Sequence, residues 1–173
     1  YEVNKRYLAL VRGWAPEWVD VNHPLRLDDA GPEAPVQEAH TQFRRIARLE
    51  LPASFDPRFP TTRVSIVEAT PSTGRRHQIR RHLKFLAHPI IGDATHGKGP
   101  LNRWWADRLG LPRLWLHAQS LEFTHPFTGE QLLVRSGLSM HQSDVPATHD
   151  SAEGLSDWRQ LLRRPEWIFD QAS

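Results

Sequence analysis

The chain has 173 residues, no cysteine and a net charge of only +2. This length suits one domain with its own core, while disulfides, thiolate nucleophiles, Cys-based zinc sites and membrane-spanning helices of roughly 18 apolar residues are excluded. Residues 42–113 carry 14 Lys/Arg against five acids, whereas residues 141–173 carry three Arg against six acids, so we expect a polyanionic partner for the basic middle, nucleic acid foremost.

The first half of the chain is rich in strand patterns. Residues 5–12 predict a strand with Tyr7, Ala9 and Val11 on one face, and Gly13 ends it. Residues 14–35 are rich in Pro, Asp and Gly, which predicts a loop with short extended pieces. Further strands are expected over residues 36–51 and 62–70, separated by the irregular stretch PASFDPRFP, whose prolines exclude regular structure.

A helix is expected over residues 74–86, and either Ser72 or Thr73 could cap it. At 100° per residue, Ile79, Leu83 and Leu86 form a stripe that faces the core. The neighbouring arc is almost wholly basic, and the basic residues on it are Arg76, His77, Arg80, Arg81 and Lys84.

The basic helix can be a solvated face or a nucleic-acid contact. Charge runs are often only solvated surface, but few acids lie nearby to neutralise this one. Trp104, Trp105 and Trp115 lie in the same basic region, and aromatic rings interleaved with Arg are typical of surfaces that hold unstacked bases. We therefore favour the nucleic-acid contact.

The second half predicts two strands, a linker and a helix. The strands are expected over residues 114–125 and 131–135, joined by the turn HPFTGE. After residue 140 an acidic linker is expected, followed by a short terminal helix over residues 156–164.

Two other patterns lack the context that their chemistry needs. Residues 92–99 (GDATHGKG) nearly match the phosphate loop, but Gly99 replaces its Ser or Thr, so we interpret the match as chance. His77, His82 and His88 have spacings of five and six, unlike the four-residue spacing of a helical zinc pair, so no metal site is expected. We expect His82 to be a hydrogen-bonded, partly buried imidazole.

Three ordered motifs span about residues 3–135. Residues 5–13 (KRYLALVRG) fit K-x-Y-x-A-x-V-x-G, residues 73–93 fit T-G-R-x-H-Q-[LI]-R followed by H-P-I-x-G-D, and residues 116–118 are L-H-A. In these motifs the chain resembles the RluA-type pseudouridine synthases, most of all their tRNA-modifying branch. The resemblance implies an α+β catalytic domain, a largely antiparallel mixed sheet with flanking helices, with residues 1–140 its C-terminal portion and residues 141–173 an acidic linker and short terminal helix.

The resemblance also implies roles for individual residues and a mechanism without metal or cofactor. Tyr7 would stack on a flipped uridine and help to remove its C5 proton, while Arg80 would pair with a catalytic aspartate. Ile79 would form the floor of the substrate pocket, with Gln78 and His77 beside it. The residues expected to contact RNA are Arg75, Arg76, Arg81 and Lys84.

The family's catalytic aspartate is the missing part of this pattern. It lies in an H-R-L-D-x-x-T-S-G motif before the Tyr strand, whereas this chain starts at Tyr1. Asp28 in LRLD follows Tyr7 and lacks the Thr-Ser-Gly, so we interpret it as unrelated to catalysis. We therefore expect the C-terminal part of a longer synthase, inactive alone. Two alternatives stay open: a stand-alone RNA-binding module, and a synthase that acts on large-subunit rRNA.

The remaining expectations concern partners and location. We expect RNA, tRNA foremost, as the partner, and a monomer with no metal and no membrane contact. A cytoplasmic location is expected, and the lack of cysteine agrees with that reducing compartment.

Overall fold

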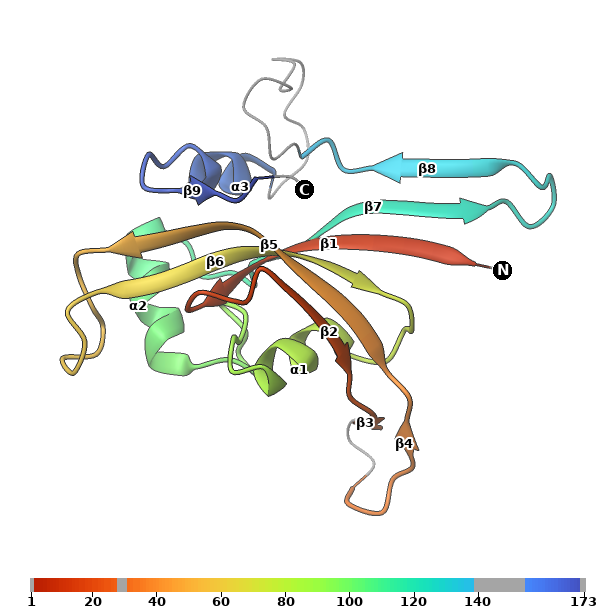
Figure 1. Cartoon of the computed structure of the whole chain (residues 1–173), viewed down its shortest axis with the longest axis horizontal. Coiled ribbons are helices and arrows are strands. Elements are labelled where there is room, and N and C mark those ends of the chain that lie inside the picture. Colours follow the sequence, from red (N-terminus) through yellow and green to blue (C-terminus); the bar gives the residue numbers. More distant parts are fainter. Residues whose placement is uncertain (1, 28–30, 139–154, 172–173) are drawn as a thin grey trace.

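Strands dominate the part of the chain that the structure describes, residues 2–27, 31–138 and 155–171 of this computed structural model (Figure 1). The strands are β1 (Val3–Arg12), β2 (Trp18–Asn22), β3 (Leu25–Arg26), β4 (Val36–Gln37), β5 (His40–Leu51), β6 (Thr62–Pro71), β7 (Leu116–Thr124), β8 (Gln131–Arg135) and β9 (Ile168–Phe169). The helices are α1 (Gln78–Phe85), α2 (Gly99–Leu109) and α3 (Leu155–Leu162).

The described strands pair antiparallel throughout. Seven of them form one sheet in the order β2-β5-β6-β1-β7-β8, with β9 paired to β5, while β3 and β4 form a separate two-stranded sheet. Within the described residues, no helix is long and apolar enough to cross a membrane.

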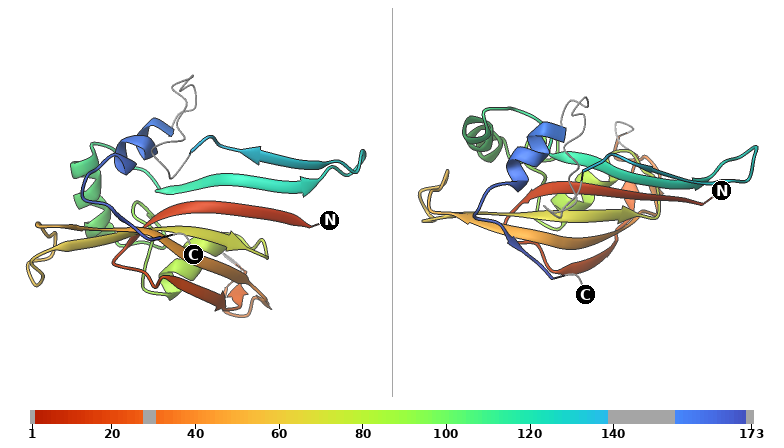
Figure 2. Two further views of the ribbon diagram at one scale, coloured as in Figure 1. Left: turned by 45° about the horizontal axis from the view of Figure 1, so that its top comes forward. Right: turned by 90° about the horizontal axis from the view of Figure 1, so that it is seen from above.

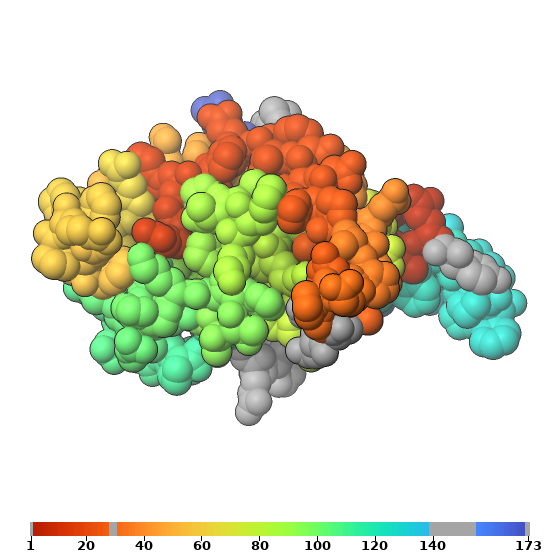
Figure 3. All heavy atoms as spheres, turned by 90° about the horizontal axis from the view of Figure 1, so that it is seen from below, coloured from red at the N-terminus to blue at the C-terminus, as the bar shows by residue number. Residues whose placement is uncertain are grey.

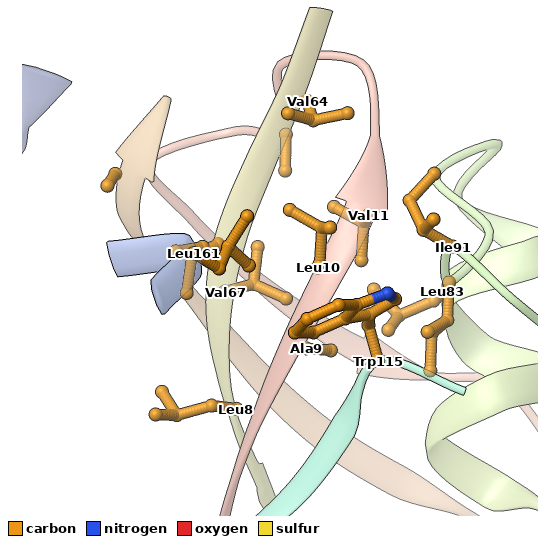
Figure 4. Close-up of a cluster of buried hydrophobic side chains, with 14 of the residues drawn as sticks. Leu8, Ala9, Leu10, Val11, Val64, Val67, Leu83, Ile91, Trp115 and Leu161 are labelled. Atoms are coloured by element: carbon orange, nitrogen blue, oxygen red, sulfur yellow. The ribbon is translucent and has the colours of Figure 1, made fainter. Parts of the chain in front are cut away.

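The C-terminal half of β1 is buried on both faces. Its residues Leu8, Ala9, Leu10 and Val11 are all fully buried, and alternate residues of a strand point to opposite faces of the sheet. Figure 1 shows the reason, since α1 lies below the sheet and α3 above it. Figure 4 shows part of the resulting core, to which β1, β6, α1 and α3 contribute. Each fully buried Leu stabilises the fold by about 1.5–3 kcal/mol.

The part of the sheet formed by β7 and β8 is largely exposed to solvent. None of the residues of β7 and β8 is fully buried, and Figure 2 shows their hairpin extending beyond the helices in both views. The pairing of β1 with β7 is interrupted by a bulge, because Arg6 lies opposite Ser120 whereas Tyr7 lies opposite Ala118. The covered half of the sheet therefore carries the core, and the bulge lies at its border.

The C-terminal segment packs on the same core as the rest of the chain. Trp158 and Leu161 of α3 are buried in it, and β9 pairs with β5. Arg45 donates hydrogen bonds from Nε and Nη2 to the Asp170 carboxylate at 2.7 and 2.9 Å, and from Nη1 to Ala15 O. The hydrogen bond from Arg45 lowers the pKa of Asp170. The linker that we expected after residue 140 lies outside the described residues up to residue 154.

Several expected elements differ from those observed. The strand expected over residues 36–51 is split, because β4 belongs to the small sheet and β5 starts only at His40. The loop expected over residues 14–35 does contain the short extended pieces that were expected in it, and one of them, β2, is an edge strand of the main sheet. Helix α2 was not expected, although Pro100 in its first turn and Gly110 at its C-cap, with φ 71°, are ordinary helix-end signals.

Candidate functional site

A pocket of about 330 Å³ opens between the start of α1 and the exposed half of β1. It brings together six of the residues that were expected to act in catalysis, substrate binding or RNA binding. The complete lining consists of Lys5, Tyr7, Pro71, Thr73, Gly74, Arg75, His77, Gln78, Ile79, Arg80, Leu114 and Leu116. The other expected RNA contacts, Arg76, Arg81 and Lys84, lie outside this lining.

Tyr7 reaches the pocket from the part of β1 that lies opposite the bulge. Its direct neighbours across the sheet are small on both sides, Ala69 on β6 and Ala118 on β7. A large ring flanked by two alanines has room to lean along the sheet surface. The extra residue of the bulge is Gln119 on β7, opposite the step from Arg6 to Tyr7, so the bulge adjoins the residue expected to stack on the base.

The start of α1 differs from the sequence-based expectation. The helix begins at Gln78, four residues late, and its N-cap is His77 with φ 54° rather than Ser72 or Thr73. Thr73 instead accepts a hydrogen bond from the backbone N–H of His40 and donates one to Gln78 Oε1. The segment before the helix is therefore held by side chains and not by a standard cap.

Gln78 is the centre of that arrangement. Its Oε1 accepts from Thr73 Oγ1 and from the backbone N–H of Arg75, and its Nε2 donates to His40 O and Thr41 Oγ1, all at 2.7–3.0 Å. An amide side chain has two donors and two main acceptor positions, so these four bonds use its full capacity. Gln78 thus lines the pocket but has no hydrogen bond left for a substrate.

Arg80 is paired with a carboxylate of this chain. Its Nε and Nη2 donate to Asp93 Oδ2 and Oδ1 at 2.8 and 2.7 Å, and Oδ1 also accepts from the backbone N–H groups of Thr95 and His96. Burial alone would raise the pKa of Asp93, but these hydrogen bonds outweigh it and the pKa is lowered. Asp93 is only 1% exposed and does not line the pocket, so it orients Arg80 and is not placed to attack a ligand.

The apolar stripe of α1 anchors the helix as expected. Ile79 and Leu83 are buried, Leu86 packs on the core, and His82 is fully buried. His82 Nε2 donates to His23 O, so its Nδ1 accepts from Thr41 Oγ1. Burial lowers the pKa of His82, which keeps the imidazole neutral. The described residues contain no cluster of side chains that could hold a metal ion.

The glycines that resembled a phosphate loop have a packing role. A Cβ on Gly92 would lie 1.6 Å from Arg113 O, and one on Gly97 would lie 2.3 Å from Asp93 O. Asn102 of α2 closes this turn by accepting from the Gly92 N–H and donating to Asp93 O. These glycines permit close backbone contacts beneath the Arg80–Asp93 pair.

The tryptophans do not form the base-holding surface that their place in the basic region suggested. Trp105 and Trp115 are buried in the core. Trp104 is half-buried, with the Arg108 guanidinium 4.0 Å from its ring centroid. The prediction failed because aromatic residues interleaved with Arg also occur on amphipathic elements that bury one face.

Comparisons with known proteins identify the family of the chain. Residues 1–85 match a family model described as RNA pseudouridylate synthase. The tRNA pseudouridine synthase C of Salmonella typhimurium is 44% identical over 100% of this chain and 66% of its own length. The tRNA pseudouridine synthase C of Vibrio vulnificus is 38% identical over 96% of this chain and 64% of its own length. The chain belongs to the RNA pseudouridylate synthase family.

Solved structures support the same family. Human RNA pseudouridylate synthase domain containing 1 has a TM-score of 0.62 and 27% identity, over 94% of this chain and 66% of that chain. The α+β fold expected from the motifs is thereby confirmed. The chain spans only about 64% of the length of the Vibrio vulnificus protein.

The synthase motifs contain two residues to which we had given no role. Lys5 lies two positions before Tyr7 on β1, hence on the same face, and lines the pocket. Asp93 ends the H-P-I-x-G-D motif and holds Arg80. The period of two along β1 could have identified Lys5, whereas the Asp93 contact depends on tertiary structure.

The described pocket has no acidic lining residue. Asp28, which we had interpreted as unrelated to catalysis, lies outside the described residues. Among the described residues, the carboxylate that binds Arg80 is that of Asp93, and both of its oxygens already accept hydrogen bonds.

Proposed function

We propose that this chain is the uridine-binding portion of a pseudouridine synthase that acts on RNA, tRNA foremost. The observation that carries the proposal is the convergence of Tyr7, Arg80 and Ile79 on one pocket at the start of a basic helix. The proposal further holds that the nucleophilic aspartate comes from outside these 173 residues. The described residues that line the pocket include no acid, which supports this, as does the greater length of the relatives.

The chemistry requires an accessible nucleotide and a proton acceptor. In the reaction the C1′–N1 bond of uridine breaks, a C1′–C5 bond forms, the proton leaves C5 and N1 gains one. The target base must leave its stack first, because its C1′ and C5 cannot be reached within a helix. Tyr7 would stack on the flipped uracil and help to remove the C5 proton, and Ile79 would support the base from below.

Arg80 would hold the incoming aspartate. Two of its nitrogens are bound to Asp93, so its guanidinium plane is fixed before any substrate arrives. A guanidinium next to a carboxylate keeps that carboxylate ionised. Arg76, Arg81 and Lys84 lie outside the pocket on or beside the same helix and would contact phosphates, which position RNA without reading its sequence.

RNA binding without turnover is the second candidate function. The absence of a carboxylate from the described pocket favours it for this chain taken alone. A synthase and a binding module would both hold RNA through α1, so binding does not separate them. Turnover does.

Tritium release from tRNA labelled at C5 of uridine tests the proposal. We expect none with the 173-residue chain, and release once the chain is extended by the residues encoded upstream of it. In that active form, Arg80→Ala should reduce turnover far more than tRNA binding, whereas Lys84→Ala should mainly weaken binding. Extended protein that binds tRNA but releases no tritium would refute the enzyme and leave the binding module. Release from rRNA but not tRNA would identify the other substrate.

A further inference from the structure

Phe85, the last residue of α1, is 57% exposed although its side chain is a large apolar ring. One face of this ring is covered by the imidazole of His23. The two ring centroids lie 3.9 Å apart and the planes are nearly parallel, at 8°. Because the ring remains more than half exposed with one face covered, its other face is open to solvent.

The residue beneath Phe85 is held through its backbone, and its ring meets the His82 ring edge-on, with the centroids 6.4 Å apart. The carbonyl of His23 accepts a hydrogen bond from Nε2 of His82 at 2.9 Å, and His82 is fully buried. A flat surface that is ordered before binding loses little conformational entropy when a ligand stacks on it. The pair of rings, Phe85 on His23, therefore has the properties of a preformed stacking surface.

Its position and charge suit RNA. Helix α1 runs from Gln78, at the pocket, to Phe85, a distance of about 10 Å at 1.5 Å per residue. Lys84 is exposed directly beside Phe85. Figure 3 shows α1, in light green, on the surface of the lower face, beside the orange residues that follow β2. A nucleotide one or two positions from a base in the pocket could reach this ring.

Other exposed aromatic rings lack this combination. Phe127, at the tip of the β7–β8 hairpin, is 93% exposed and only tilted against His125, with centroids 6.0 Å apart. Among the described residues, His23 and Phe85 form the one parallel ring stack. A protein partner would need a larger apolar patch, whereas the residues next to Phe85 include exposed Lys84.

We propose that Phe85, supported by His23, is a stacking platform for an unpaired base next to the target uridine. This inference rests on the proposed RNA-binding function and adds a second contact to it. Base stacking on an aromatic ring tolerates any base, because every base has a flat face. The platform would hold the strand beside the flipped nucleotide without selecting its sequence.

Fluorescence anisotropy of the 173-residue chain with a labelled single-stranded RNA, and with a hairpin in which the same residues are paired, tests the platform. Phe85→Ala should raise the Kd for the single strand about 5- to 100-fold, with an unchanged salt slope. Phe85→Leu should raise the Kd by a similar factor, because it keeps the apolar bulk but removes the flat ring on which a base stacks. Phe85→Trp keeps a flat ring and should retain binding. Lys84→Gln should reduce the salt slope by about one ion. Phe127→Ala is the matched control and should change nothing.

The outcomes separate the two proposals. If the unaltered chain binds neither RNA, the proposed RNA function is overturned and the platform with it. If it binds RNA but Phe85→Leu matches Phe127→Ala, the platform alone is overturned. An equal loss for the paired hairpin would also overturn it, because a paired base cannot stack there.

Discussion

Arg80 lines the pocket, and its orientation is fixed by Asp93, which lies outside the pocket lining. Asp93 accepts two hydrogen bonds from one edge of the guanidinium and two more from the backbone of residues 95 and 96. The pair joins α1 to the turn that Asn102 closes. The direction in which Arg80 reaches the pocket is therefore part of the fold and does not depend on a ligand.

Asp93→Ala should destabilise the protein by about 3–5 kcal/mol, because it removes the carboxylate that accepts two hydrogen bonds from the largely buried guanidinium of Arg80. Urea unfolding measures this loss. Asp107→Ala on exposed α2 surface is the matched control and should stay within about 0.5 kcal/mol. A loss below about 1 kcal/mol for Asp93→Ala would mean that Arg80 finds another partner at no cost.

At the scale of the element, the end of α1 contains an unusual residue. The N–H of Ala87 bonds to Lys84 O, and the N–H of His88 bonds to Leu83 O, which is the hydrogen-bond pattern of a Schellman C-cap. Ala87 has φ 63°, a conformation in which Cβ crowds the backbone and for which glycine is normally chosen. Helix α1 thus ends in a strained turn between Phe85 and the H-P-I-x-G-D motif.

Ala87→Gly should stabilise the protein by about 1 kcal/mol, because it removes the Cβ that crowds the backbone at this positive φ. Little packing is lost, because Ala87 is exposed. Thermal unfolding should show a higher Tm. The same change inside α2, Ala106→Gly, is the control and should cost about 1 kcal/mol. A lower Tm for Ala87→Gly would show that this residue is not strained.

The elements that depend on local pattern were predictable, and those that depend on distant contacts were not. The period of two located β1, β6 and β8, and the stripe of Ile79 and Leu83 located α1. The start of α1 was misplaced because Gln78, tied to β5 residues 37 and 38 positions away, holds the turn. Strand β9 has two residues and exists only through its pairing with β5.

The same limit applies to the site. Motif resemblance predicted that Tyr7, Arg80 and Ile79 would share a pocket, and they line one. Their roles in catalysis remain predictions. The sequence could not show that Gln78 has no free hydrogen-bonding atom, nor that Arg80 already has a carboxylate partner. It also favoured tryptophans as base contacts, whereas the exposed ring on the basic helix is Phe85.

For the whole molecule, the Arg45–Asp170 pair ties the residue that follows β9, the last described strand, to β5 of the main sheet. The Arg45 side chain is only 8% exposed, and Asp170 supplies both oxygens to it. With Trp158 and Leu161 of α3 in the core, the C-terminal segment covers the face of β1 opposite α1 (Figure 1). The site below the sheet thus depends on packing above it.

Asp170→Ala should cost about 3 kcal/mol of unfolding free energy, because a buried guanidinium loses its counter-charge and keeps only the bond to Ala15 O and a distant Glu17. Chemical denaturation followed by tryptophan fluorescence measures it. Glu166→Ala, which removes an exposed pair with Arg164, is the control and should cost less than about 1 kcal/mol. Equal effects of the two substitutions would show that β9 is held by its backbone alone.

The separation of Arg45 and Asp170 along the chain has a consequence for synthesis on the ribosome. The two residues are 125 positions apart, so a nascent chain exposes the guanidinium long before its partner has been made. Until Asp170 emerges, the guanidinium on β5 has only Ala15 O, the distant Glu17 and water as partners, and the upper face of β1 lacks α3. Because α3 cannot pack on β1 before it has been synthesised, a ribosome stalled before α3 would leave that face open to chaperones.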